Sequence, residues 1–151
     1  MLDSFSLSYY YWPTVGTHAP GVRLEFPAVL TCGGHPMETD PVAVVAAQVD
    51  AYNARDLDRF LECYSPDAVI EDGSGQVLMR GREAMRPVYE QLFAESPELH
   101  CEIRQRIRVG PYVVDEEAIT GFHLAGFPTE VHAAAVYRVE GDRIVHVRGL
   151  M

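Results

Sequence analysis

The sequence has few basic residues, few cysteines and no long apolar run. Arginine and lysine together number 12 against 22 aspartates and glutamates, which gives a formal net charge of −10. Such an excess of acidic groups repels a phosphate backbone, so we expect no nucleic acid among the partners of this chain. No apolar run is long enough to cross a bilayer, so we expect no membrane partner either.

The three cysteines, Cys32, Cys63 and Cys101, are far apart and odd in number. They show no CxxC spacing, so the sequence predicts neither a disulfide framework nor a zinc site. Free thiols are typical of a reducing compartment, and we therefore expect a cytoplasmic protein. Cys63 and Cys101 stand among apolar positions and are interpreted as small hydrophobic residues rather than nucleophiles.

A chain of 151 residues suffices for one domain with a single core. Residues 1–36 contain pieces such as YYYWP and CGGHP, which follow neither a helical nor a strand period. We predict an irregular N-terminal extension there, and one interpretation places the biological start at Met37. The alternative is an aromatic arm that packs on the domain or on a partner. The folded domain is predicted to span residues 37–151.

Helical patterns come first in this domain and strand patterns last. Asp40-Pro41 is typical of a helix start, and Asp56 is predicted to cap a second helix. A third helix is expected after Gly81, and strands are expected at 67–72 and 76–79. From residue 99 onward apolar residues recur at every second position, which predicts antiparallel strands. The predicted fold class is α+β, with three N-terminal helices packed on a curved, mostly antiparallel sheet.

The first strand of this second half combines apolar and basic residues. We expect one face to be buried, formed by Leu99, Cys101, Ile103, Ile107 and Val109. The other face would carry Arg104, Arg106 and Arg108. We interpret these arginines as a solvated row paired with acids such as Asp115 on the neighbouring strand, rather than as a grip for an anionic ligand.

Two adjacent carboxylates, Glu71 and Asp72, end the strand predicted at 67–72. Because side chains alternate along a strand, Asp72 would share the inward face with Ile70, and Glu71 would point outward. A carboxylate in an apolar pocket has a raised pKa and can take a proton next to a carbonyl. The competing interpretation is that Asp72 caps a turn before Gly73.

Four segments, in order along the chain, resemble the nuclear transport factor 2-like superfamily. They are AYNARDLDRFLECYSPDAVIEDG, GREAMRPVYEQLF, VVDEEAITG and AVYRVEGDRI. Within the superfamily they are most similar to the SnoaL-like and steroid delta-isomerase-like small bacterial proteins. The resemblance implies a cone-shaped α+β fold with a pocket between the helices and the sheet, and a homodimer.

The resemblance also implies roles for individual residues. It places Asp72 at the position of the general base of ketosteroid isomerases, and Tyr64 and Tyr89 where those enzymes keep tyrosines near the catalytic one. The oxyanion donor position on the first helix holds Gln48. The second donor position falls on Ala135, which carries no donor group. Tyr52, one helical turn after Gln48, could supply a hydroxyl instead.

We therefore predict a small-molecule isomerase or cyclase-type enzyme that needs no cofactor and no metal. Asp72 would be the base that abstracts a proton next to a carbonyl of an apolar ligand, with Gln48, Tyr52, Tyr64 and Tyr89 around that ligand. The alternative is a non-catalytic ligand-binding or dimerising accessory domain of the same fold. An enzyme predicts a buried Asp72 that faces a cavity, whereas an association domain predicts a filled cone and an apolar external patch.

Overall fold

The computed structural model describes residues 39–126 and 128–151 of the chain. The predicted extension 1–36 and the proposed start at Met37 lie outside these residues. The elements follow in the order α1 (Pro41–Ala54), α2 (Leu57–Glu62), β1 (Tyr64–Glu71), β2 (Val77–Arg80), α3 (Arg82–Glu95), β3 (His100–Val109), β4 (Tyr112–Thr120), β5 (Glu130–Glu140) and β6 (Arg143–Leu150).

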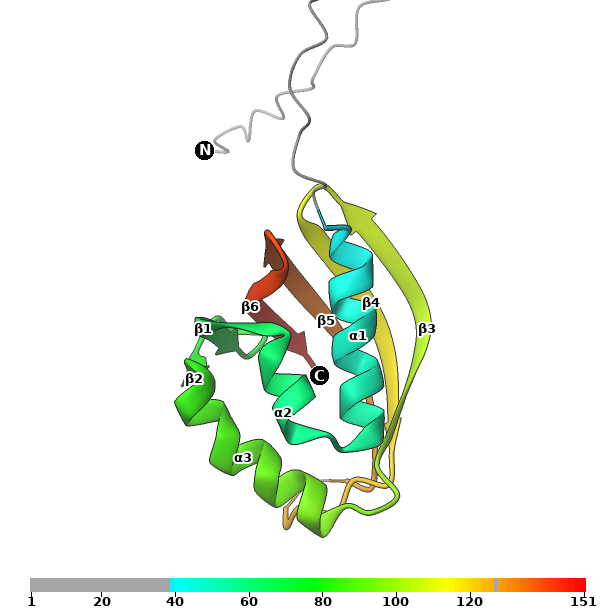
Figure 1. Ribbon diagram of the computed structural model, residues 1–151. Helices are drawn as coiled ribbons and strands as arrows, with labels where there is room; N and C mark the ends of the chain where they lie inside the picture. Colours follow the sequence, from blue (N-terminus) through cyan, green and yellow to red (C-terminus); the bar gives the residue numbers. More distant parts are fainter. Residues whose placement is uncertain (1–38, 127) are drawn as a thin grey trace, which may run out of the picture. The chain divides into compact units, whose positions relative to one another are not determined.

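The six strands form one sheet in the order β2-β1-β6-β5-β4-β3. Strands β1 and β6 run parallel, and every other neighbouring pair is antiparallel. The predicted α+β class with a curved, mostly antiparallel sheet is thus confirmed. The prediction of three N-terminal helices holds for two of them, because the β1–β2 hairpin forms before α3 (Figure 1).

The helices begin where the sequence predicts. The Asp40 carboxylate accepts a hydrogen bond from the Val42 amide at 3.1 Å, and Pro41 opens α1. The Asp56 carboxylate accepts one from the Arg59 amide at 3.1 Å at the start of α2. Helix α1 packs on β3, β4 and β5, whose strands curve around it, whereas α3 packs on β1 and β2 (Figure 1). An inner space is therefore bounded by α1, α3 and the concave face of the sheet.

An aromatic cluster joins the helices to this sheet. Phe60 of α2 is fully buried at its centre. Its ring lies 6.0 Å from that of Tyr52, 5.2 Å from Tyr64, 4.4 Å from Tyr89 and 5.8 Å from Phe93, measured between centroids. Three of the predicted site residues are thus brought together by core packing, with edge and tilted ring contacts that stabilise the cluster.

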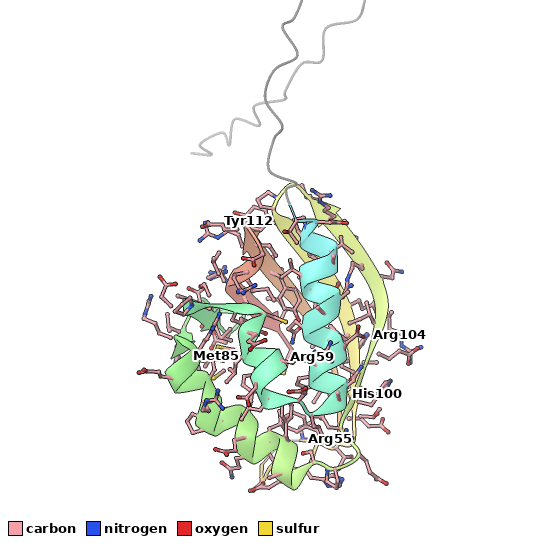
Figure 2. The ribbon with its side chains drawn as sticks, viewed as in Figure 1. Arg55, Arg59, Met85, His100, Arg104 and Tyr112 are labelled. Carbon is pink, nitrogen blue, oxygen red and sulfur yellow. The ribbon has the colours of Figure 1, made fainter. Side chains whose placement is uncertain are left out.

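Strand β3 contains a β-bulge that the sequence pattern did not reveal. Ile103 pairs with Glu117 of β4, but Gln105 pairs with Glu116, so that Arg104 is an extra residue in the ladder. An extra residue reverses which side chains face the core beyond it. Arg104 itself projects away from the sheet at this point (Figure 2).

The bulge overturns the predicted faces of the second half of β3. Ile107 and Val109 are 57% and 64% exposed, although they were expected in the core. Arg106 instead turns inward, where Nε and Nη2 donate to the two carboxylate oxygens of Asp115 at 2.7 and 2.6 Å. The expected pairing of this arginine with an acid on the neighbouring strand is confirmed. The prediction that Arg106 lies on a solvated face is wrong, because its partner, the Asp115 side chain, is completely buried.

Candidate functional site

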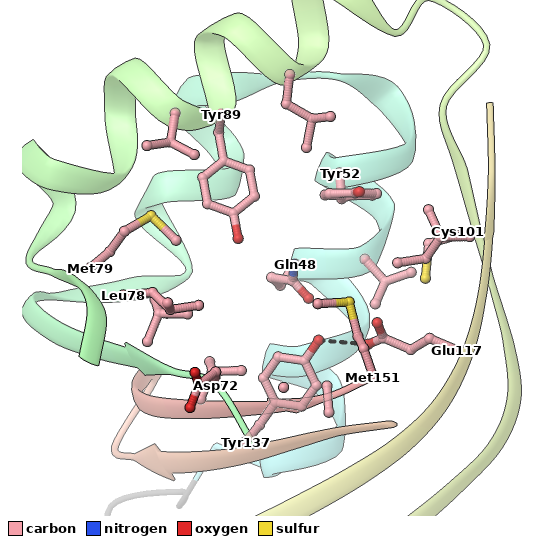
Figure 3. Close-up of a pocket in the computed structure, with 18 of the residues that line it drawn as sticks. Gln48, Tyr52, Asp72, Leu78, Met79, Tyr89, Cys101, Glu117, Tyr137 and Met151 are labelled. Carbon is pink, nitrogen blue, oxygen red and sulfur yellow. Dashed lines mark hydrogen bonds between the residues drawn. The ribbon is translucent and has the colours of Figure 1, made fainter. Parts of the chain in front are cut away.

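A cavity of about 320 Å³ occupies the inner space between the helices and the sheet. This volume is within the range of small-molecule binding sites. All five residues that the sequence singled out line it: Gln48, Tyr52, Tyr64, Asp72 and Tyr89. Most of the remaining wall is apolar. The close-up in Figure 3 shows Gln48, Tyr52, Asp72 and Tyr89 around the cavity.

Two small residues leave room for the cavity. Ala135 of β5 pairs with Gly149 of β6, and both line the space above the sheet. A Cβ built on Gly149 would meet only the carbonyl oxygen of Glu71, at 3.9 Å. Larger side chains at these two positions would occupy the volume that a ligand needs.

Glu117 of β4 is the buried acid of this cavity. Its side chain shares the inward face of the strand with Asp115, and the residue is 8% exposed. Its Oε1 accepts a 2.8 Å hydrogen bond from the hydroxyl of Tyr137, drawn as the dashed line in Figure 3. Burial, and to a lesser degree the neighbouring Asp115 carboxylate, raises the pKa of Glu117, while the hydrogen bond from Tyr137 opposes that rise.

The nearest arginine does not neutralise Glu117. Arg106 directs its guanidinium at Asp115, two residues away on the same face. Among the described side chains, none of opposite charge lies within ion-pair distance of Glu117. Glu117 is therefore a desolvated carboxyl group without an ion-pair partner, whose pKa is governed first by burial and then by the hydrogen bond from Tyr137.

Gln48 and the three predicted tyrosines surround the same space. Gln48 is 5% exposed, and its Oε1 is buried without a hydrogen-bond partner among the described groups. Burial raises the pKa of Tyr89 to about 12, and it also raises the pKa values of Tyr52 and Tyr64 well above the usual range. All three phenols therefore stay protonated at neutral pH and can donate hydrogen bonds. In Figure 3 the Tyr89 hydroxyl and the Gln48 amide point into the same space.

Asp72 lies at the edge of the cavity, near Leu78 (Figure 3). Its Oδ1 accepts hydrogen bonds from the Ser74 amide at 2.9 Å, the Ser74 hydroxyl at 2.7 Å and the Gln76 amide at 2.9 Å. These bonds lower the pKa of Asp72, so the expected rise in its pKa is wrong. The carboxylate fixes the β1–β2 turn, which was the competing interpretation, while remaining in contact with the cavity.

Glu71 is oriented by ion pairs on the far side of its strand. Its carboxylate lies 2.7 Å from Arg148 and 3.1 Å from His146, both on β6. The alternation predicted for this strand, with Glu71 outward, agrees with these contacts. The Arg148 and His146 partners lower the pKa of Glu71 and leave it ionised.

Sequence reasoning missed Glu117 and Tyr137, although a signal for each was present. Alternation along VVDEEAIT from the buried Val113 places Asp115 and Glu117 on the inward face. The same alternation along β5 places Tyr137 on the same face as Ala135. Ala135 carries no donor group, and Tyr137, two residues further along the strand, lines the same cavity with a phenol.

The described residues give little support for a cysteine nucleophile, a metal site or a membrane span. Burial raises the pKa of the Cys101 thiol to about 12, so this cavity-lining residue is a neutral thiol rather than a nucleophile. Among the described residues no group of three or more His, Cys, Asp or Glu side chains is arranged to hold a metal ion. Within residues 39–126 and 128–151, no helix combines the length and apolar character needed to span a bilayer.

Comparison with known proteins identifies relatives of this domain. The model of the SnoaL-like domain matches residues 45–147. An uncharacterized cystatin-fold protein from Novosphingobium aromaticivorans is 31% identical, with a TM-score of 0.68 over 75% of this chain and 99% of that one. No protein of curated function matches the sequence.

Two more distant structures share the fold. A hypothetical protein with a ketosteroid isomerase-like fold from Catenulispora acidiphila, in complex with trimethylamine, is 23% identical, with a TM-score of 0.57 over 70% of this chain and 82% of that one. Wild-type IdmH, "a putative polyketide cyclase from Streptomyces antibioticus", is 24% identical, with a TM-score of 0.60 over 73% of this chain and 90% of that one.

Proposed function

Because the chain belongs to the SnoaL-like domain family of the nuclear transport factor 2-like superfamily, we propose that it is a small-molecule enzyme of the isomerase or cyclase type. The reaction would be proton transfer next to a carbonyl group of an apolar ligand. The observation that carries this proposal is the buried carboxyl group of Glu117, which faces an apolar cavity and is hydrogen-bonded to Tyr137. Related folds described as isomerase-like or as a cyclase candidate support the reaction class.

Glu117 would act as the proton carrier. A raised pKa brings a carboxyl group closer to neutral pH, where it both accepts and returns a proton efficiently. The negative charge that develops on the carbonyl oxygen needs donors, and the Gln48 amide and the Tyr52 and Tyr89 phenols line the same cavity. The apolar wall excludes water and strengthens these interactions.

Asp72 is the second candidate for the base, because it lines the same cavity and the family resemblance places it at the position of the isomerase base. Its three hydrogen bonds to the turn stabilise the ionised form and weaken it as a proton acceptor. Glu117 is therefore the stronger proposal. If neither residue transfers protons, the apolar cavity supports the alternative function, a non-catalytic ligand-binding domain.

An isomerisation assay with two matched variants separates these possibilities. The full chain is given a β,γ-unsaturated ketosteroid or a smaller β,γ-unsaturated cyclic ketone, and formation of the conjugated ketone is followed by ultraviolet absorbance. Glu117→Gln should lower the rate by about 100-fold or more, and Asp72→Asn should change it only slightly. The reverse pattern would make Asp72 the base. Ligand binding without conversion by the wild type would identify a binding domain.

The predicted homodimer and the cytoplasmic location stay predictions. Size-exclusion chromatography with light scattering on the purified full chain measures the molar mass and so tests the homodimer. A monomeric mass at the concentrations used for the assay would contradict it.

A further inference from the structure

The polar groups of the cavity wall are acidic or neutral, never basic. Three acidic residues line it among those described, Glu71, Asp72 and Glu117, and none of the lining residues is an arginine or a histidine. The Glu71 carboxylate itself is turned to His146 and Arg148, so Asp72 and Glu117 supply the carboxylates of the wall. The whole sequence contains no lysine. The two arginines closest to these acids are engaged, Arg106 with Asp115 and Arg148 with Glu71. A ligand that carries a carboxylate or a phosphate would meet no positive partner here.

Hydrogen-bond acceptors in the wall also lack partners. The Oε1 of Gln48 is buried and accepts no hydrogen bond from the described residues. Glu117 receives its hydrogen bond at Oε1 from Tyr137, which leaves its other oxygen for the ligand. An unmet buried acceptor costs free energy, and a ligand that brings an N–H donor removes that cost.

Aromatic rings complete the wall. Tyr52, Tyr64, Tyr89 and Tyr137 all line the cavity. The face of an aromatic ring attracts a cation, and the attraction is strongest where water is excluded. The rings add an attraction for positive charge to that of the carboxylates, and they also provide the apolar surface that a neutral hydrocarbon skeleton needs.

From these three features we propose that the cavity is selective for charge. It binds apolar ligands that carry a protonated amine and excludes ligands of the same size that carry a carboxylate or a phosphate. Glu117 is the residue that determines this selection, because it is the most buried of the three acids that line the cavity and has no cationic partner of its own. The inference rests on the proposed function only in placing the substrate in this cavity, and it does not depend on turnover.

Three ligands with one skeleton test the selection. Cyclohexylmethylamine, cyclohexyl methyl ketone and cyclohexanecarboxylate are titrated separately into the full chain at neutral pH by isothermal titration calorimetry. The expected order of affinity is amine, ketone, carboxylate. The amine should bind at least about tenfold more tightly than the ketone, since a charge-assisted hydrogen bond and a cation–π contact together exceed the free energy of a tenfold step.

Two variants show whether Glu117 sets the order. Glu117→Gln keeps the shape and removes the charge, so the amine should lose its advantage over the ketone. Asp142→Asn removes one negative charge from an exposed turn and should leave the order unchanged. Circular dichroism and thermal unfolding confirm that both variants fold.

The other outcomes overturn the proposal. They are equal or tighter binding of the carboxylate, tighter binding of the ketone than of the amine, no detectable binding of the amine, or an order that survives in a folded Glu117→Gln. A failure of the proposed function looks different. In that case the ligands would bind in the expected order, but no isomerisation would occur.

Discussion

The hydroxyl of Tyr137 donates a 2.8 Å hydrogen bond to Oε1 of Glu117, and both residues line the same cavity. The two side chains come from neighbouring strands, β5 and β4. Burial favours the neutral form of Glu117, and the Tyr137 hydroxyl favours the ionised form. The net effect is a pKa of Glu117 above the ordinary glutamate value.

The stability of Glu117→Gln relative to the wild type should increase as the pH rises. The folded pKa of Glu117 is raised, so the unfolded chain ionises first. Wild-type stability is then lost as the pH rises from the ordinary glutamate pKa through the folded one, whereas glutamine undergoes no such loss. The free energy of unfolding of both proteins is measured with urea at acid and at mildly alkaline pH. A difference between them that does not change with pH would contradict the raised pKa.

Removing the Tyr137 hydroxyl should raise the pKa of Glu117 further. Tyr137→Phe deletes the hydrogen bond that favours the ionised carboxylate and leaves the ring in place. The pKa is read from the carbon-13 shift of the Glu117 carboxyl group in an NMR titration, with Glu117→Gln used to assign the signal. In an active enzyme the acid limb of the pH–rate profile should move to higher pH by the same amount as the pKa of Glu117. An unchanged or lower pKa would show that the hydrogen bond does not tune Glu117.

The Arg106–Asp115 pair should contribute strongly to stability. Asp115 is completely buried, so Asp115→Ala leaves a partly buried guanidinium without its partner and should lower the free energy of unfolding by about 3 kcal/mol. Arg104 and Glu102 form an exposed pair on the same strand. Arg104→Ala should change the free energy of unfolding by about 0.5 kcal/mol or less. Equal losses of unfolding free energy for the two substitutions, measured with urea, would contradict the prediction that the buried pair contributes more to stability than the exposed pair.

Filling the cavity should abolish binding without unfolding the domain. Ala135→Leu places a larger side chain over the space that Ala135 and Gly149 leave open. Ala134→Leu, on the opposite face of β5, is the matched control. We expect the first variant alone to lose affinity for cyclohexyl methyl ketone in calorimetry, while both keep the circular dichroism spectrum of the wild type. Retained binding by Ala135→Leu would place the ligand elsewhere.

Local chemistry made much of the framework predictable from the sequence. Asp40 and Asp56 cap their helices through contacts within the next few residues, which a sequence pattern can reveal. The family resemblance located the cavity, since Gln48, Tyr52, Tyr64, Asp72 and Tyr89 all line it. Whether these residues perform chemistry stays a prediction.

Two features depended on tertiary context and were not predicted. The bulge at Arg104 exists only in the pairing of β3 with β4. The sequence could not locate it, because the polar residues around Arg104 fit either face of a strand. The sequence did not distinguish Glu117 from its acidic neighbours, because a carboxyl group is rarely buried without a partner. Its partner, Tyr137, lies 20 residues away and becomes a neighbour only when β4 and β5 pair.

The most direct test of proton transfer by Glu117 is the exchange of α-hydrogens in a cyclic ketone that binds the cavity. The full chain, Glu117→Gln and Asp72→Asn are each incubated with the ketone in heavy water, and deuterium incorporation is followed by NMR. We expect exchange well above the buffer rate with the wild type and with Asp72→Asn, and exchange at the buffer rate with Glu117→Gln. Undiminished exchange by a folded Glu117→Gln, or none by the wild type with the ketone bound, would contradict a catalytic role for Glu117.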